Sequence, residues 1–278
     1  MKIAMCTELF KEHSFKEICC ILHDIGYTGA ELAPFQFGED IRELSQDKIR
    51  EIRQTAEEFS LELTAFHWLL VSPPDLHITN PDPKITTETQ NFFTGLIDFA
   101  ADLNISRLVF GSPNQRNIPS NVEYSDWYDH GVMFFQKMAD YSAARNVIIA
   151  FEPLGRSITN FGATTADALD LIQDVDHKSF KLHLDASAMH RDDLSIQEQL
   201  DLVAKTPEVL EYVHLNDENQ LGPGMGDNDL KPLLSEIIKM GYNGWFSVEA
   251  FKDDVPIENI AKESYKYVAE TLSELMKK

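Results

Sequence analysis

Eight short apolar segments alternate with stretches of helical periodicity along the chain, and this alternation constrains the fold more than any other feature. The apolar segments are rich in residues that favour strands. We expect strands at residues 2–7, 29–33, 61–68, 106–111, 147–152, 180–185, 210–216 and 244–250. Strands that alternate strictly with helices form a parallel sheet, because each helix returns the chain to the same edge.

The length of the chain favours a closed sheet over an open one. A barrel of eight such units takes ~250 residues, and this chain has 278. An open dinucleotide-binding sheet would place Gly-x-Gly-x-x-Gly after its first strand, whereas the glycines at 222, 224 and 226 follow the seventh. The sequence shows no linker and no low-complexity segment. We therefore predict one (β/α)8 TIM barrel domain over residues 1–278.

Four of the predicted strands end in a carboxylate or an imidazole. These residues are Glu152 in IIAFEP, Asp185 in FKLHLD, His214 in EYVHLND and Glu249 in WFSVEAF. In a barrel the carboxyl ends of the strands meet at one face, where catalytic groups lie. A buried carboxylate is costly unless a positive charge meets it. We predict that the four residues hold one divalent metal ion, Mn²⁺, Mg²⁺, Co²⁺ or Zn²⁺.

The residues two positions before these strand ends face the same way, one layer deeper in the barrel. They are Ala150, His183, Tyr212 and Ser247. Small or polar residues are unusual in a structural layer and tolerable beneath a polar site. We expect His183 to be a hydrogen-bonded core histidine rather than a ligand.

Composition limits the partners of the chain. The net charge of −22, from 46 acidic and 24 basic residues, repels phosphate backbones, so no nucleic acid is expected as a partner. No apolar run approaches the ~20 residues that span a bilayer, so no membrane is expected either. The segment MKIAMCTELF reaches an acidic residue too early for a secretory signal. We expect a cytoplasmic protein without disulfides, which could form a homo-oligomer.

Several segments resemble those of a known superfamily. FEPLGR, LHLDAS, VHLND followed by PGMG, and GYNGWFSVEAF resemble the xylose-isomerase-like TIM barrels, in particular the sugar phosphate isomerase/epimerase family. The resemblance covers nearly the whole chain and implies the same four metal ligands. It also implies that His67, at the end of the third strand, and Arg156, four residues after Glu152, contact the substrate.

The sequence departs from this family around the substrate. Ketose 3-epimerases of the family carry a glutamate and an arginine where this chain has Ile158 and Gln220, and many members of the family carry a histidine where it has Ala188. The metal ligands are intact, so the departures concern which substrate is bound and which reaction follows. No basic cluster suits a phosphate, which favours an unphosphorylated sugar or polyol as the small-molecule partner.

The residue types predict a sugar isomerase or epimerase that acts on a keto-sugar or polyol through an enediolate. Glu152 and Glu249, three strands apart around the barrel, would exchange the proton from opposite faces of the substrate. The same proton abstraction begins an alternative reaction, in which a metal-dependent lyase dehydrates a keto-polyol or acts on a 3-keto-glycoside. Two weaker alternatives are an endonuclease IV-like DNA repair enzyme and a non-catalytic sugar-binding barrel.

Overall fold

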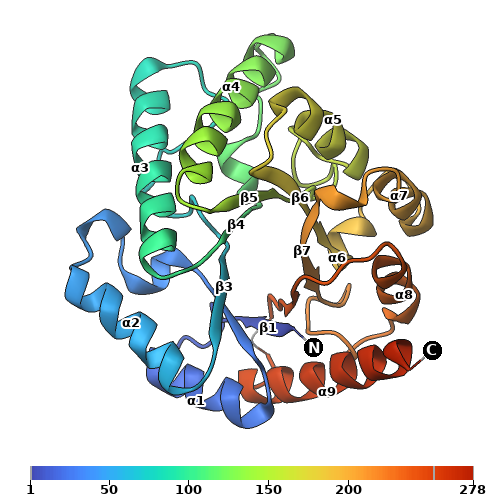
Figure 1. Cartoon of the computed structure of the whole chain (residues 1–278). Helices are drawn as coiled ribbons and strands as arrows, with labels where there is room; N and C mark the ends of the chain where they lie inside the picture. The colour runs from blue at the N-terminus through green and yellow to red at the C-terminus, as the bar shows by residue number, and fades with distance from the viewer. Residues whose placement is uncertain (1, 253, 278) are drawn as a thin grey trace.

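The strands of the molecule close into a parallel barrel in sequence order. A computed structural model describes residues 2–252 and 254–277. Each strand pairs in parallel with the next, and β8 pairs back with β1 (Figure 1). The strands are β1 (Ile3–Cys6), β2 (Gly29–Leu32), β3 (Glu62–Phe66), β4 (Arg107–Phe110), β5 (Ile148–Phe151), β6 (Phe180–Asp185), β7 (Leu210–Leu215) and β8 (Phe246–Val248). The predicted (β/α)8 barrel is confirmed.

Helices surround the barrel as an outer layer (Figure 1). They are α1 (Phe15–Ile25), α2 (Gln46–Glu58), α3 (Pro83–Asp102), α4 (Tyr124–Ala143), α5 (Thr165–Val175), α6 (Ala186–Met189), α7 (Ile196–Val203), α8 (Lys231–Lys239) and α9 (Ile257–Met276). Short 3-10 helices are η1 (Pro34–Phe37), η2 (Ile41–Glu43), η3 (Pro113–Gln115) and η4 (Pro207–Val209). The sequence analysis did not predict the short helix α6, which begins directly after β6.

Local sequence signals explain where the outer helices begin and end. Helix α1 begins after Ser14, whose hydroxyl accepts from the Glu17 amide while the Glu17 carboxylate accepts from the Ser14 amide. It ends at Gly26, whose φ of 115° needs a residue without a Cβ. The helix buries one face, with Ile18 and Leu22, in the core between the barrel and the helix layer.

Two apolar clusters fill the molecule. The larger lies between the strands and the helices and contains most of the buried phenylalanines. The smaller consists of Ala4, Ala65, Val109, Ala150, Tyr212 and Trp245. Its three alanines leave room for the two large rings, and the Tyr212 hydroxyl lies 2.7 Å from Thr64 Oγ1. The barrel is therefore packed beneath the face on which the predicted site lies.

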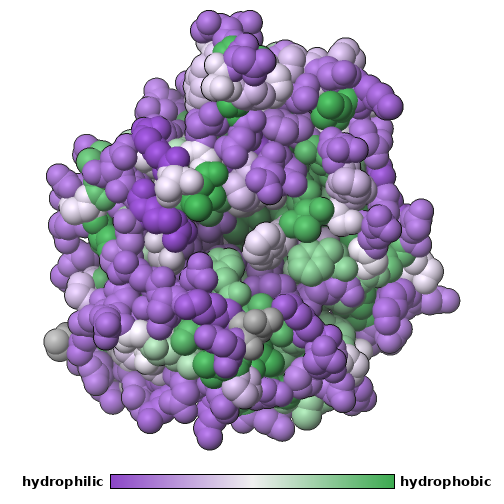
Figure 2. Space-filling model, turned by 180° about the vertical axis from the view of Figure 1, so that it is seen from behind, coloured by the Kyte–Doolittle hydropathy of each residue, from purple (hydrophilic) through white to green (hydrophobic). Residues whose placement is uncertain are grey.

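Strand register brings the predicted site residues to one level. Asp185 on β6 pairs with His214 on β7, and Leu215 pairs with Val248 on β8, one residue before Glu249. Figure 2 shows the molecule from the side opposite to Figure 1, where hydrophobic residues gather around a central hollow within a hydrophilic periphery. Among the described residues, no helix is both long and apolar enough to cross a membrane.

Candidate active site

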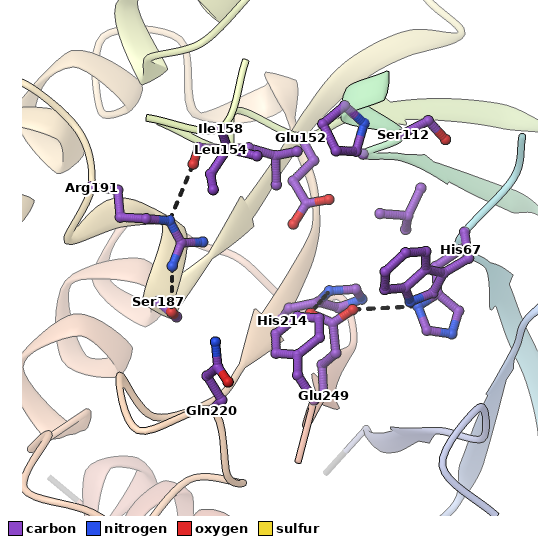
Figure 3. A pocket seen from close by; sticks show the side chains of 15 residues that line it. His67, Ser112, Glu152, Leu154, Ile158, Ser187, Arg191, His214, Gln220 and Glu249 are labelled. Atoms are coloured by element: carbon purple, nitrogen blue, oxygen red, sulfur yellow. Dashed lines mark hydrogen bonds and ion pairs between the residues drawn. The ribbon is translucent and has the colours of Figure 1, made fainter. Parts of the chain in front are cut away.

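A cavity of about 240 Å³ lies at the carboxyl ends of the strands (Figure 3). It is lined by His67, Trp68, Val109, Gly111, Ser112, Pro113, Glu152, Leu154, Ile158, Ser187, Arg191, His214, Gln220, Glu249 and Phe251. Glu152 and Glu249 face each other across it (Figure 3). Trp68, Ile158 and Phe251 are 38%, 43% and 42% exposed, so its rim is apolar and accessible.

The structure brings together the four residues predicted as metal ligands. Ligand atoms of Glu152, Asp185, His214 and Glu249 all lie within 4.8 Å of one another, and all four residues are buried. Each residue comes from the end of a different strand or directly follows one, β5 to β8. Three carboxylates and an imidazole thus share one small volume at the bottom of the cavity.

The imidazole of His214 lies between two carboxylates. Its Nδ1 is 3.1 Å from Glu249 Oε2, and its Nε2 is 3.0 Å from Glu31 Oε1. When the proton of the neutral ring is on Nε2, this nitrogen donates to Glu31. Nδ1 then has a free lone pair that faces the carboxylate cluster and can bind a metal ion. Sequence reasoning missed Glu31, although a lone acidic residue inside the apolar run of GAELAPF was a signal that it needs a buried partner.

Asp185 is fixed by groups that follow β6 and β7. Its Oδ1 accepts from the amide of Ala188 at the start of α6, and Asn216 Nδ2 donates to its Oδ2. Asn216 Oδ1 in turn accepts from the amide of Ser187, 2.8 Å away. The sequence analysis did not identify Asn216, which orients the carboxylate from the neighbouring strand.

The position of Glu152 depends on a neighbouring glycine and on a buried arginine. A Cβ on Gly111, the residue after β4, would collide with Glu152 Oε2. Arg116, fully buried, donates from Nη1 to the Glu152 carbonyl at 2.9 Å and lies over the Phe151 ring. Arg116 therefore supports the backbone at Glu152 from within the core, although it lies in the loop after β4.

The carboxylates carry opposite pKa shifts. Burial raises the pKa of Glu152 to about 8, with Glu249 and Asp185 contributing repulsion. Burial and Glu249 likewise raise the pKa of Asp185 to about 6. For Glu249, burial opposes ionisation, but His214 and His67 outweigh it and hold its pKa below the usual range. Without a cation, the cluster therefore resists ionisation of all three carboxylates.

His67 lies in the cavity, on the side of Glu249. Its Nδ1 is 3.4 Å from Glu249 Oε1, and its Nε2 is 3.1 Å from Glu8 Oε2. Burial disfavours the imidazolium, yet Cys6, Glu8 and Glu249 raise the pKa of His67 well above its usual value. The predicted position of His67 at the substrate is consistent with this placement.

Arg156 does not lie in the cavity. It is absent from the cavity lining, and it pairs with Asp167 at 3.1 Å and Asp193 at 2.6 Å on the outside of the loop. The expected substrate contact of Arg156 is thus not supported, because the loop after β5 turns its side chain outward. A different arginine, Arg191, lines the cavity, and the sequence analysis did not single it out.

The expectation for His183 was partly wrong. The side chain is fully buried, as expected of a core residue, but neither ring nitrogen has a hydrogen-bond partner among the described residues. Its ring stacks on Tyr212 and meets the His214 ring edge-on at 4.2 Å between centroids. Burial and His214 lower the pKa of His183 well below its usual value, so it supports the site as a neutral ring.

The donor set fits a divalent cation. Carboxylate oxygens and one imidazole nitrogen suit Mg²⁺, Mn²⁺, Co²⁺ and Zn²⁺. The raised pKa values of Glu152 and Asp185 show that the buried negative charge lacks sufficient compensation from the protein alone. A divalent ion among the four residues would supply it.

Comparison with known proteins identifies the family of the chain. Residues 21–271 match the family described as the xylose isomerase-like TIM barrel. The chain belongs to this family. The match extends over all strands from β2 to β8, and therefore includes the four strand ends that converge in the cavity.

Several proteins that are similar to this chain in sequence or structure are named as epimerases. D-psicose 3-epimerase from Ruminiclostridium cellulolyticum is 22% identical over 231 residues, which cover 82% of this chain and 75% of that protein. A solved structure of D-psicose 3-epimerase in the presence of D-fructose has a TM-score of 0.85 at 18% identity, covering 99% of each chain. 3-keto-D-glucoside 4-epimerase from E. coli has a TM-score of 0.79 at 17% identity, covering 100% of each. These structural similarities show that this chain and the two solved structures have the same barrel fold.

Proposed function

We propose that the chain is a divalent-metal-dependent sugar isomerase or epimerase that acts on a keto-sugar or polyol. The observation that carries the proposal is the convergence of Glu152, Asp185, His214 and Glu249, whose ligand atoms lie within 4.8 Å of one another. The epimerase names of the relatives support the reaction class. The cavity of about 240 Å³ suits a small substrate rather than a polymer.

The proton is exchanged by the two glutamates that face each other. A divalent ion held by the four residues would stabilise the negative charge that develops on the substrate when the C–H beside its carbonyl is deprotonated. One of Glu152 and Glu249 removes this proton, and the other delivers one from the opposite face. Asp185 and His214 act as ligands only, since Asn216 and Glu31 occupy their remaining polar atoms.

Residues around the two glutamates orient the substrate and limit water. The Nδ1 of His67 lies 3.4 Å from Glu249 Oε1 without forming a hydrogen bond, and it donates to a substrate oxygen bound beside Glu249. Trp68 and Phe251 provide exposed aromatic faces at the cavity, which can stack on the C–H face of a sugar ring and shield an enediolate from water.

Deuterium exchange tests the proposed reaction. Metal-loaded protein is incubated in D₂O with D-fructose, D-psicose or L-ribulose, and products are followed by NMR and mass spectrometry. An epimerase or isomerase incorporates deuterium at the carbon next to the carbonyl, with no other change in mass. We expect Glu152→Gln and Glu249→Gln each to lower turnover ~10²–10⁴-fold, because each removes a positioned acid-base group.

The outcomes separate the alternatives. A product lighter by one water identifies a dehydratase instead, and exchange at the rate of free metal identifies a binding protein. Exchange that persists in both glutamine variants, with the ion still bound, would contradict the two-glutamate mechanism and leave the metal site standing.

A further inference from the structure

Arg191 is a permanently cationic side chain in the lining of the cavity. It follows α6, and among the described residues that line the cavity it is the sole lysine or arginine. Its guanidinium lies across the cavity from His67, with Glu152, His214 and Glu249 between them (Figure 3). A substrate that spans the cavity from the proposed reacting centre reaches this arginine.

The guanidinium is held in place before any ligand binds. Its Nε donates to the Leu154 carbonyl at 3.2 Å, and its Nη1 donates to Ser187 Oγ at 2.9 Å. Gly155, with φ of +87°, lets the loop after β5 pack against the Arg191 backbone, where a Cβ would come within 2.7 Å of the carbonyl oxygen. The other terminal nitrogen points towards the cavity (Figure 3).

The charge of Arg191 has no partner in the part of the chain that the structure describes. In a protein with 46 acidic and 24 basic residues, arginines readily find carboxylates. Those paired with a carboxylate are Arg42, Arg50, Arg53, Arg107, Arg145 and Arg156. By contrast, no carboxylate from residues 2–252 or 254–277 lies within 4.0 Å of Arg191, or of Arg116, which is fully buried and not in the cavity lining. A fixed, unpaired guanidinium at the wall of a cavity is suited to binding an anionic group.

We propose that Arg191 and Ser187 bind a carboxylate at the far end of the substrate, so that the enzyme acts on a keto-sugar acid in preference to a neutral ketose. This inference rests on the proposed function. A carboxylate matches the donors present, one guanidinium edge and one hydroxyl. A phosphate dianion calls for more cationic donors, whereas the neighbouring walls, Leu154, Ile158 and Phe251, are apolar.

A matched pair of substrates tests the subsite. D-fructuronate differs from D-fructose only in carrying a carboxylate in place of the terminal hydroxymethyl group. We expect the wild-type protein to turn over D-fructuronate with a kcat/KM about 10–100-fold higher, as for a charge-assisted hydrogen bond. Arg191→Gln should remove this preference, chiefly by raising KM for D-fructuronate, so that the ratio of the kcat/KM values for the two substrates falls to about 1.

A control variant and a third substrate complete the test. Arg50→Gln, on the exposed surface of α2, should leave both kcat/KM values unchanged. Equal losses for both substrates in Arg191→Gln would mean that the arginine only holds the loops together, and would overturn the proposal. Preference for D-fructose 6-phosphate over D-fructuronate would overturn the assignment to a carboxylate.

Calorimetry distinguishes failure of this inference from failure of the proposed function. If neither substrate is turned over, but wild-type protein binds D-fructuronate more tightly than D-fructose and Arg191→Gln does not, the subsite stands and the proposed reaction falls. If D-fructose is epimerised or isomerised and the carboxylate gives no advantage in binding or turnover, the reaction stands and the subsite falls.

Discussion

At the scale of single residues, the site is defined by partners that hold the proposed ligands in position. His214 contacts Glu31 and Glu249 through its two ring nitrogens, and Asp185 is held by Asn216. These second contacts decide which atom of each ligand faces the cluster. Their contribution is comparable to that of the ligands, because an imidazole with the wrong tautomer cannot bind a metal.

The role of Glu31 can be measured through metal affinity. We expect Glu31→Gln to weaken Mn²⁺ binding ~10–100-fold, because the amide no longer favours the His214 tautomer with its proton on Nε2. Isothermal titration gives the affinity independently of turnover. Glu62→Gln, an exposed carboxylate at the start of β3, is the matched control. Equal affinities of the Glu31→Gln and wild-type proteins would show that Glu31 does not orient the ligand.

At the scale of elements, the ends of the strands combine structural and functional roles. Asp185 ends β6 and also caps the short helix α6, so one carboxylate fills both roles. The end of β4 provides space instead of a ligand, since Gly111 leaves room for the Glu152 carboxylate from the next strand. Each strand end is thus shaped by its neighbour.

The space beside Glu152 makes Gly111 sensitive to substitution. We expect Gly111→Ala to lower kcat/KM by ~10²-fold, because a methyl group there displaces the carboxylate by about 1 Å from its working position. Steady-state kinetics checks this, with circular dichroism to verify the fold. Gly95→Ala in α3, where the added methyl crowds the flexible side chain of Arg42 and makes an ordinary contact with Ile41, is the control. An unchanged kcat/KM would show that Glu152 has another productive position.

At the scale of the whole molecule, the barrel brings together several buried carboxylates whose negative charge its own residues do not neutralise. The carboxyl ends of β5 to β8 deliver three buried carboxylates to one point. The apolar layer of Ala4, Ala65, Ala150, Tyr212 and Trp245 beneath them offers no cation. The fold is stable without the ion only to the extent that some of these carboxylates keep their protons.

The stability of metal-free protein should therefore fall as pH rises. The pKa values of Glu152 and Asp185 in the folded state, about 8 and about 6, exceed the ordinary values of 4.5 and 3.8. Folded protein then binds more protons than unfolded protein, so stability decreases from about pH 5 to about pH 8. His67 and His214, with raised pKa values, act in the same direction, whereas His183, with a lowered pKa, opposes them. Each kcal/mol lost lowers Tm by ~2–4 °C.

Differential scanning fluorimetry with and without a chelator checks this dependence. Added Mn²⁺ should raise Tm more at the upper end of the pH range than at the lower end, since it replaces the protons that the carboxylates have lost. Glu152→Gln should flatten the decline in the metal-free protein. A Tm that rises with pH in the presence of the chelator would contradict the assigned charge balance.

Much of this architecture could be predicted from the sequence because its signals are local. Strands and helices are recognised from the pattern of apolar residues among close neighbours in the sequence. Strict alternation of the two allows few topologies, so the barrel and the positions of its strand ends could be predicted. The four residues predicted as ligands needed only their positions at strand ends, because every carboxyl end in such a barrel opens on one face.

Loop geometry and contacts between distant segments were decided only by the tertiary structure. Arg156 and Arg191 both follow strands that carry a ligand, yet the first pairs with surface acids and the second lines the cavity. Glu31 and His214 are 183 positions apart and meet only because the barrel closes. Side-chain direction in a loop depends on packing against neighbouring loops, and periodicity carries no information about that packing.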